Sequence, residues 1–316
     1  MSYRGVVGHE AVLERLRSLA RRGRAAHAYC FAGPSGIGKR RVALGLARAL
    51  LCETRGGEAC DSCVTCGRTA RGAHPDLKLL ACEEDRKEIS IAQVREVIRE
   101  LSFVGTGPRA VIVDEAEKMN EEAQNALLKT LEEAPDRTVI LLVTSSPASL
   151  LPTIRSRCQT VFFFALEEAE VLRVLKDDGP EARLAAALSD GSPGRAAELR
   201  EDLREWGPES AEILSRVAEG DLNAIVEGLT RIRDASKSRS RAHRILRLVA
   251  TALREAFRAR AGAPVAARLA PAGWAGGLDL DALAERLDAL LDHAPMIDRN
   301  ASVPLVVEDA LLGIGR

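Results

Sequence analysis

The sequence predicts an α/β domain built on a parallel β-sheet, followed by a region made only of helices. In the first half, short apolar runs alternate with stretches of helical periodicity, whereas no strand-like run follows Phe164. Such alternation is typical of parallel strands joined by crossover helices. In addition, the 316 residues of the chain exceed the roughly 250 to 300 that one hydrophobic core usually holds. We therefore expect more than one domain.

The expected strands are the short apolar runs of the first half. They are His27–Ala32, Leu77–Leu80, Ala110–Val113, Thr138–Val143 and Thr160–Phe164. Before the fourth run, small and apolar residues recur at helical spacing, which predicts an amphipathic helix that ends near Pro135. The residues of this stripe are Ala123, Ala126, Leu127, Thr130 and Leu131.

The chain after Phe164 is rich in Ala, Leu, Arg and Glu, and we expect only helices there. Its clearest stripe, spaced for one buried helix face, consists of Ile245, Leu248, Val249, Ala252, Leu253, Ala256 and Phe257. Between residues 263 and 277, prolines and glycines around Trp274 predict a loop or a short helical break.

The charge balance and the low aromatic content argue against some classes of function. The 45 Lys and Arg residues nearly cancel the 46 Asp and Glu residues, so the chain as a whole is not marked as a nucleic-acid binder. Aromatic residues make up only 3%, which argues against a surface that stacks single-stranded bases. The sequence has neither an apolar run of about 20 residues nor a signal-peptide core, and this predicts a cytoplasmic protein.

A glycine-rich segment follows the first expected strand and opens a helical run. It consists of Gly33, Pro34, Ser35, Gly36, Ile37, Gly38 and Lys39. The pattern is G-x-x-x-x-G-K between a strand and a helix, in which backbone amides, the helix N-terminus and the lysine surround a polyphosphate. We therefore expect a phosphate site here, with ATP and Mg²⁺ as candidate ligands.

Arg40 departs from this pattern. The residue after the lysine is normally Ser or Thr, whose hydroxyl is a Mg²⁺ ligand, whereas a guanidinium cannot coordinate a cation and adds a like charge beside it. The backbone amides and Lys39 can still hold a nucleotide. The sequence leaves open whether this chain hydrolyses it.

Polar side chains follow two of the expected strands. Asp114 and Glu115 come directly after the run Ala110–Val113, as in an acidic pair whose Asp orients Mg²⁺ and whose Glu polarises the attacking water. Thr144 follows the fourth strand, where a polar side chain can sense a γ-phosphate. These residues extend the candidate nucleotide site.

A cluster of cysteines follows the helix of the glycine-rich segment. The spacing C-x₇-C-x₂-C-x₂-C suits four thiolates around a tetrahedral Zn²⁺ and leaves no open position for catalysis. We predict a structural zinc module at residues 52–66. His74 lies nearby, but beside Pro75 it is interpreted as a loop residue. The predicted ligands are Cys52, Cys60, Cys63 and Cys66.

Ser156-Arg157-Cys158 precedes the fifth expected strand, and with the motifs above it makes the sequence similar to the clamp-loader family of AAA+ ATPases. In that family the Arg of this tripeptide is an arginine finger that reaches the nucleotide of a neighbouring subunit. The resemblance covers about the first half of the chain. It is carried by Val7–Glu10, His27–Tyr29, Gly33–Lys39, the four cysteines, Gly72–Leu77, Asp114–Glu117, Ala123–Glu133 and Leu151–Cys158.

The resemblance implies a RecA-like AAA+ domain over residues 1–165 that contains the zinc module, a small helical lid over 166–206 and a helical collar over 207–316 that binds related subunits. It implies that Arg157 stabilises charge on a neighbour's γ-phosphate. Arg195 lies in a segment similar to the family's sensor-2 region, where it could contact phosphate.

Within the family, the missing hydroxyl at Arg40 favours a stator subunit over the ATP-hydrolysing gamma/tau motor subunits. The implied partners are gamma/tau and delta subunits in a heteropentamer, the sliding clamp and primed DNA, in a bacterial replisome associated with the nucleoid. Two alternatives stay open. One is a motor subunit that hydrolyses its own ATP, and the other is a zinc-containing DNA-binding protein with a relic phosphate loop, whose basic residues would lie between 231 and 247.

Overall fold

The computed structural model divides into two compact units, each described here by itself. The first consists of Met1–Asp177 with Asp190–Arg195, and the second of Asp178–Ser189 with Ala196–Arg316. The residues that the structure describes are 3, 5–23, 25–54, 56–82, 88–102, 107–204, 226–227, 230, 235–262, 279–297 and 302–315.

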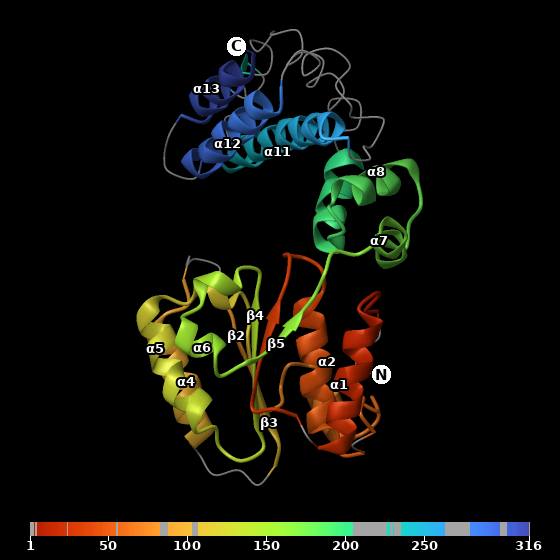
Figure 1. Cartoon of the computed structure of the whole chain (residues 1–316), viewed down its shortest axis with the longest axis vertical. Coiled ribbons are helices and arrows are strands. Elements are labelled where there is room, and N and C mark those ends of the chain that lie inside the picture. The colour runs from red at the N-terminus through yellow and green to blue at the C-terminus, as the bar shows by residue number, and fades with distance from the viewer. Residues whose placement is uncertain are drawn as a thin grey trace. The chain divides into compact units, whose positions relative to one another are not determined.

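The first unit is built on a five-stranded sheet with the order β2-β3-β4-β1-β5, and every pairing in it is parallel (Figure 1). The strands β1, β3 and β4 are buried along their whole length, which explains why they read as continuous apolar runs in the sequence. The predicted parallel sheet is therefore confirmed, with ends that differ by one or two residues. The strands are β1 Ala28–Ala32, β2 Leu77–Leu80, β3 Arg109–Val113, β4 Thr138–Thr144 and β5 Gln159–Phe162.

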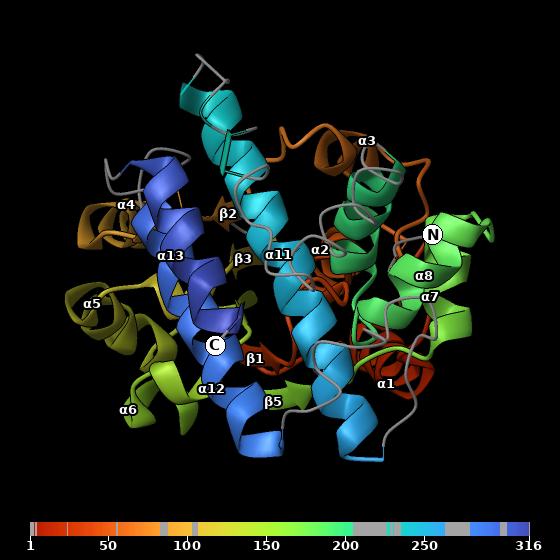
Figure 2. The same ribbon diagram turned by 90° about the horizontal axis from the view of Figure 1, so that it is seen from above.

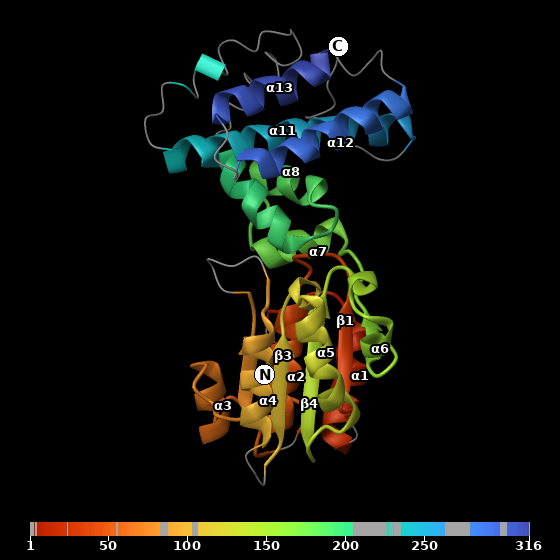
Figure 3. The ribbon, with the colours of Figure 1, turned by 90° about the vertical axis from the view of Figure 1, so that its left-hand side faces the viewer.

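Helices cover both faces of this sheet. Figures 1 and 3 agree that α1 and α2 lie on one face and that α4 and α5 lie on the other. On the second face Val111 and Val113 of β3 pack into one core with Leu127 and Leu131 of α5. The helices of the first unit are α1 Glu10–Arg22, α2 Lys39–Leu51, α3 Val64–Ala70, α4 Ile91–Ser102, α5 Glu121–Glu132, α6 Pro152–Arg155 and α7 Glu168–Leu175, with 3-10 turns η1 Ala116–Lys118 and η2 Pro147–Ser149.

Helix α5 is the one that the spacing of small and apolar residues predicts. It begins after Asn120, whose side-chain oxygen accepts a hydrogen bond from the Ala123 amide at 2.9 Å and so satisfies one amide that the first turn leaves unpaired. Ala123 and Leu131 are both fully buried. The helix ends at Glu132, before Pro135, as expected.

The described part of the second unit is helical. Figure 2 shows α11, α12 and α13 side by side, and they share one core in which Ile245, Val249 and Leu253 of α11 pack with residues of the other two helices. The predicted stripe is thus the buried face of α11. The predicted break at 263–277 lies outside the described residues. The helices are α8 Pro180–Leu188, α11 Ala235–Arg260, α12 Leu280–Ile297 and α13 Val303–Gly315.

None of the helices in the described ranges combines the length and the apolar character needed to cross a bilayer.

Candidate functional site

The Gly33–Lys39 loop connects β1 to α2, the strand-to-helix context that its pattern requires. Two glycines make its path feasible. Gly33 has φ 154°, and a β-carbon there would overlap the backbone carbonyl of Phe163. Gly38 has φ 99°, in the left-handed region, where it caps the start of α2. The loop therefore depends on glycine at both ends.

Lys39 is almost completely buried, with 6% of its surface exposed. Its ammonium group donates hydrogen bonds to the carbonyl oxygens of Gly33 at 2.7 Å and of Pro34 at 2.6 Å. Burial lowers the pKa of Lys39, and the nearby carboxylates of Glu117 and Asp114 partly oppose this shift. The lysine is held by the loop itself and lies beside the acids.

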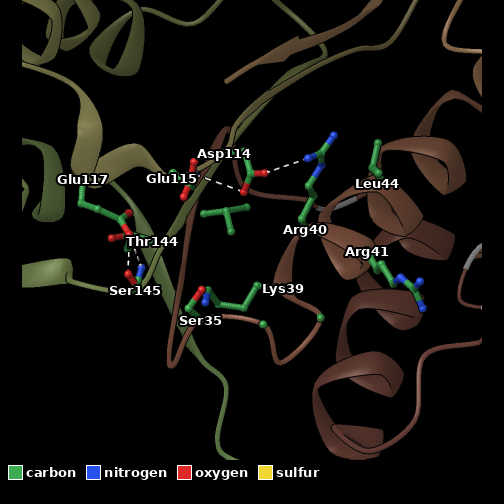
Figure 4. A pocket seen from close by; sticks show the side chains of 13 residues that line it. Ser35, Lys39, Arg40, Arg41, Leu44, Asp114, Glu115, Glu117, Thr144 and Ser145 are labelled. Carbon is green, nitrogen blue, oxygen red and sulfur yellow. Dashed lines mark hydrogen bonds and ion pairs between the residues drawn. The ribbon is translucent and has the colours of Figure 1, made fainter. Parts of the chain in front are cut away.

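The loop, the end of β3 and the end of β4 enclose a pocket of about 650 Å³ (Figure 4). Of the predicted residues, Ser35, Lys39, Arg40, Asp114, Glu115 and Thr144 all line it. The order of the strands explains why these residues lie together. The strands β1, β4 and β3 are neighbours, and the carboxyl ends of parallel strands lie at one edge of the sheet. The pocket has the size and position of a ligand site in an open α/β fold.

Arg40 forms an ion pair with Asp114 inside this pocket. The Arg40 Nη1 atom lies 3.2 Å from the Asp114 Oδ2 atom, and Figure 4 shows the two side chains pointing toward each other. Burial nevertheless raises the pKa of Asp114, and the attraction of Arg40 only partly opposes it, in keeping with a guanidinium that is half exposed. The residue that breaks the motif therefore contacts the carboxylate that would orient Mg²⁺.

The residues fit a magnesium ion poorly for this reason. A Mg²⁺ ion needs oxygen ligands in octahedral geometry, and its usual hydroxyl ligand is replaced here by a cation that already contacts Asp114. Glu115 is also engaged, since its Oε2 atom accepts from the Lys118 ammonium at 2.8 Å. Both members of the acidic pair thus have countercharges from their own chain.

Glu117 also lines the pocket, although no motif in the sequence predicted it as a site residue. Its Oε1 atom accepts hydrogen bonds from the backbone amide and the hydroxyl of Ser145. Burial opposes ionisation, but the bonds from Ser145 and the backbone outweigh it and hold the pKa of Glu117 below its usual value. In the sequence, its position two residues after Glu115 was the feature that could have indicated a role in the site. In the structure it lies on the 3-10 turn η1.

Thr144 is the last residue of β4 and is 1% exposed. Its hydroxyl oxygen accepts from the Ser146 amide at 3.0 Å. The residue lines the pocket, as its position after the fourth strand led us to expect.

The segment with Arg195 belongs to the first unit and packs on the glycine-rich loop. The Ser192 hydroxyl donates to the Ser35 carbonyl at 2.9 Å, and the Gly194 amide donates to the Gly36 carbonyl at 3.0 Å. The guanidinium of Arg195, however, pairs with Asp190 at 2.9 Å and does not line the pocket. These hydrogen bonds place the segment beside the loop, whereas the Arg195 side chain is directed toward Asp190.

Arg157 follows α6 and does not line the pocket either. Its guanidinium forms an ion pair with Glu132, and its Nη1 atom donates to the Thr153 carbonyl at 2.9 Å. The next residue, Cys158, is buried in the core on the second face of the sheet. Arg157 is thus held by Glu132 and Thr153 of its own chain and is partly exposed.

The four predicted cysteines lie together in the first unit. Their sulfur atoms all lie within 4.8 Å of one another, and those of Cys60 and Cys66 are 4.0 Å apart. Four sulfurs around Zn²⁺ at about 2.3 Å are about 3.8 Å apart, so this donor set fits a tetrahedral zinc ion. Backbone amides of Cys60, Cys63 and Cys66 each donate to a cluster sulfur at 3.4 Å. His74 accepts instead from the Asp76 amide at 3.2 Å.

The parallel five-stranded sheet, with its glycine-rich loop after β1 and acids after β3, matches the fold of AAA+ clamp-loader-like proteins. Residues 8–167 match the family described as DNA polymerase III, delta subunit, and the chain belongs to that family. Relatives named DNA polymerase III subunit delta' are 42% identical over 190 residues in Pseudomonas aeruginosa and 36% identical over 181 residues in Bacillus subtilis. The resemblance to clamp-loader subunits is therefore confirmed.

These matches are partial. They cover 57% of this chain and 58% and 54% of the two relatives, so the chain spans little more than half of their length. The tau subunit of Escherichia coli is 30% identical over 224 residues, which are 70% of this chain and 31% of that protein. A gamma subunit-related protein from Thermotoga maritima covers 96% of this chain and 98% of its own, with a TM-score of 0.52 and 18% identity, and so supports the fold alone.

Proposed function

We propose that this chain is the stator subunit of a bacterial DNA polymerase III clamp loader, which completes a neighbour's ATPase site without hydrolysing ATP itself. The observation that carries the proposal is the 3.2 Å contact between Arg40 and Asp114 in a pocket that otherwise keeps the residues of an ATP site. The second supporting observation is the intact Ser156-Arg157-Cys158 tripeptide, whose residues do not line that pocket.

The first part of the proposal concerns the chain's own pocket. Hydrolysis of ATP needs Mg²⁺ to bridge the phosphates, together with a carboxylate that positions the attacking water. Arg40 takes the place of the hydroxyl ligand and contacts Asp114, while Lys118 contacts Glu115 at 2.8 Å. Amides of the loop and Lys39 can bind phosphate without Mg²⁺, but catalytic residues that are paired in this way do not support turnover.

The second part concerns Arg157. A guanidinium inserted from a neighbouring subunit stabilises charge on the transferred phosphoryl group, an effect of roughly 10³ to 10⁵ in rate in systems where it has been measured. Arg157 is partly exposed and lies away from the chain's own pocket. We assign it to a nucleotide bound by an adjacent gamma/tau subunit.

The rest of the architecture follows from the same assignment. Residues 1–165 would form the AAA+ domain with a structural zinc ion, 166–206 a lid and 207–316 a collar that joins gamma/tau and delta subunits in a heteropentamer. Helices α11 to α13 share one hydrophobic core, and this agrees with the proposal of a helical collar. The assembly would load the sliding clamp onto primed DNA at the bacterial replisome.

The DNA-binding alternative has less support. Of the basic residues between 231 and 247, Arg244 and Arg247 lie within 3.5 and 3.3 Å of Asp202, respectively, and so carry less positive potential than the sequence suggests. Arg231 and Arg233 lie outside the described residues. A motor subunit remains the closer competitor because Lys39, Asp114 and Glu115 do meet in one pocket.

The decisive experiment is reconstitution of this chain with gamma/tau and delta subunits, clamp and primed DNA. Replacing Arg157 with Ala should lower the clamp-stimulated ATPase rate by roughly 10²-fold or more, whereas Arg155→Ala, a neighbouring exposed arginine, should change it little. An unchanged rate in the Arg157 variant would remove the finger from the mechanism. ATP turnover by the isolated chain that Lys39→Ala abolishes would favour the motor subunit instead.

A further inference from the structure

We propose that Glu132 is a positioning residue for Arg157, which holds the guanidinium in the orientation that reaches a neighbour's phosphate. This inference rests on the proposed function, because it concerns the residue that the neighbour would use. The observation behind it is the ion pair between the Nη2 atom of Arg157 and the Oε1 atom of Glu132.

The guanidinium is held through two of its nitrogen atoms. Glu132 contacts Nη2, while the Thr153 carbonyl and the Ser156 hydroxyl accept from Nη1 at 2.9 and 3.4 Å, respectively. A planar group that is fixed through two different nitrogens keeps little freedom to rotate. A guanidinium has five N–H donors, more than these contacts use, so donors are left for an anion. Glu132 thus restricts the orientation of Arg157 but does not occupy all of its N–H donors.

The element that carries Glu132 is itself firmly placed. Glu132 is the last residue of α5, and α6 with Thr153 packs against that helix (Figure 1). The side chain of Gln124, 5% exposed, joins α5 to the segment before α6. Its amide nitrogen donates to the Ser149 carbonyl at 3.3 Å, and its oxygen accepts from the Leu151 amide at 2.8 Å. A rigid support of this kind is what a preorganised side chain needs.

The energetics favour a positioning role over a stabilising one. The Arg157 and Glu132 side chains are 34% and 47% exposed, and ion pairs at such sites contribute little to folding. Removing Glu132 should therefore leave the fold intact while it frees Arg157 to adopt other rotamers. The expected effect is therefore a slower ATPase reaction at the neighbouring subunit's site.

The test uses the reconstituted complex and measures kcat and KM for ATP separately. Glu132→Ala should lower kcat about two- to fivefold, the rate equivalent of an exposed ion pair, with little change in KM. Glu132→Asp, which keeps the charge, should recover part of the rate. Glu133→Ala removes the adjacent exposed carboxylate and serves as the matched control, for which we expect the rate of the unchanged protein.

The double variant Glu132→Ala with Arg157→Ala separates the two proposals. If Glu132 acts through Arg157, the double variant should be no slower than Arg157→Ala alone. Glu132→Ala and Glu133→Ala with equal rates, alongside a slow Arg157→Ala, would overturn the positioning role and leave the finger in place. A faster Glu132→Ala enzyme would mean that the carboxylate competes with phosphate, which also contradicts the proposal. No effect of Arg157→Ala would refute the finger, and the positioning role with it.

Discussion

The candidate nucleotide pocket and the cysteine cluster both present groups that can bind cations, but they differ in the source of the positive charge. In the pocket, the carboxylate of Asp114 is paired with Arg40 of the same chain. In the cluster, four sulfur atoms lie within 4.8 Å of one another, and backbone amides donate to three of them. Thiolates so close together repel each other, so this site is stable in the thiolate form only with a metal ion.

Under the proposed function, this difference explains why the domain would bind zinc at the cysteine cluster but not magnesium in the pocket. A single guanidinium beside a carboxylate makes a divalent ion unnecessary there, and the fold around it need not change. Among the described residues, the hydrogen bonds to the four cysteine sulfurs come from hydroxyl, amide and thiol groups and not from a cation. We expect zinc to be essential for the local structure of residues 52–66 and Mg²⁺ to be dispensable for the pocket.

The largest predicted effect is loss of the metal from the cysteine cluster. Cys63→Ser should remove most of the bound zinc and lower the melting temperature by roughly 5 to 15 °C, because metal binding at such sites contributes directly to folding. Metal analysis by mass spectrometry and differential scanning calorimetry measure the two effects. Cys82→Ser, outside the cluster, should keep its zinc. A fully reduced chain that folds equally well without zinc would show that the cluster is not a structural metal site.

A smaller effect is expected where Arg40 is removed from the pocket. Arg40→Thr restores a hydroxyl ligand and releases Asp114, so nucleotide affinity should gain a dependence on Mg²⁺ of about tenfold, or about 1.4 kcal/mol. Titration of a fluorescent ATP analogue with and without Mg²⁺ measures it. Arg41→Thr changes an adjacent arginine that also lines the pocket and should show no such gain. Strong Mg²⁺ dependence in the unchanged protein would mean that Arg40 does not exclude the ion.

The smallest effect concerns the charge on Asp114. Burial raises its pKa in the folded chain, so the ionised form is disfavoured by folding. This penalty is absent below the pKa of the unfolded chain and is complete once the pH rises above the folded pKa. Asp114→Asn should therefore raise the melting temperature by at most a few degrees at pH 7, with no gain at about pH 3.5.

The partner of Asp114 offers a check on this last prediction. With Arg40→Thr as the background, the attraction that partly opposes burial is gone, so the gain from Asp114→Asn at pH 7 should become larger. Melting curves of the unchanged protein, the two single variants and the double variant across pH 3.5 to 8 measure this difference. A gain that is constant over this range would assign the effect to packing and not to ionisation.

Local patterns explain how much could be predicted from the sequence. The strands β1, β3 and β4 are buried on both faces, so they appear as uninterrupted apolar runs. The four clustered cysteines lie within fifteen residues, Cys52 to Cys66, so their spacing alone predicts a common centre. Strand ends were less exact because hydrogen bonding with neighbours sets them. For β5, pairing with β1 extends from Gln159 to Phe162, one residue earlier than the apolar run begins.

The sequence by itself determined the class of fold, the glycine-rich loop, the cysteine cluster and the family, since all of these depend on neighbours along the chain. Only the tertiary structure decided which charged and polar groups meet: Arg40 with Asp114, Glu117 with Ser145 and Arg157 with Glu132. These partners come from separate elements that sheet order and helix packing bring together. An ion pair depends on distances of 3 to 4 Å between side chains, and spacing in the sequence does not specify such distances.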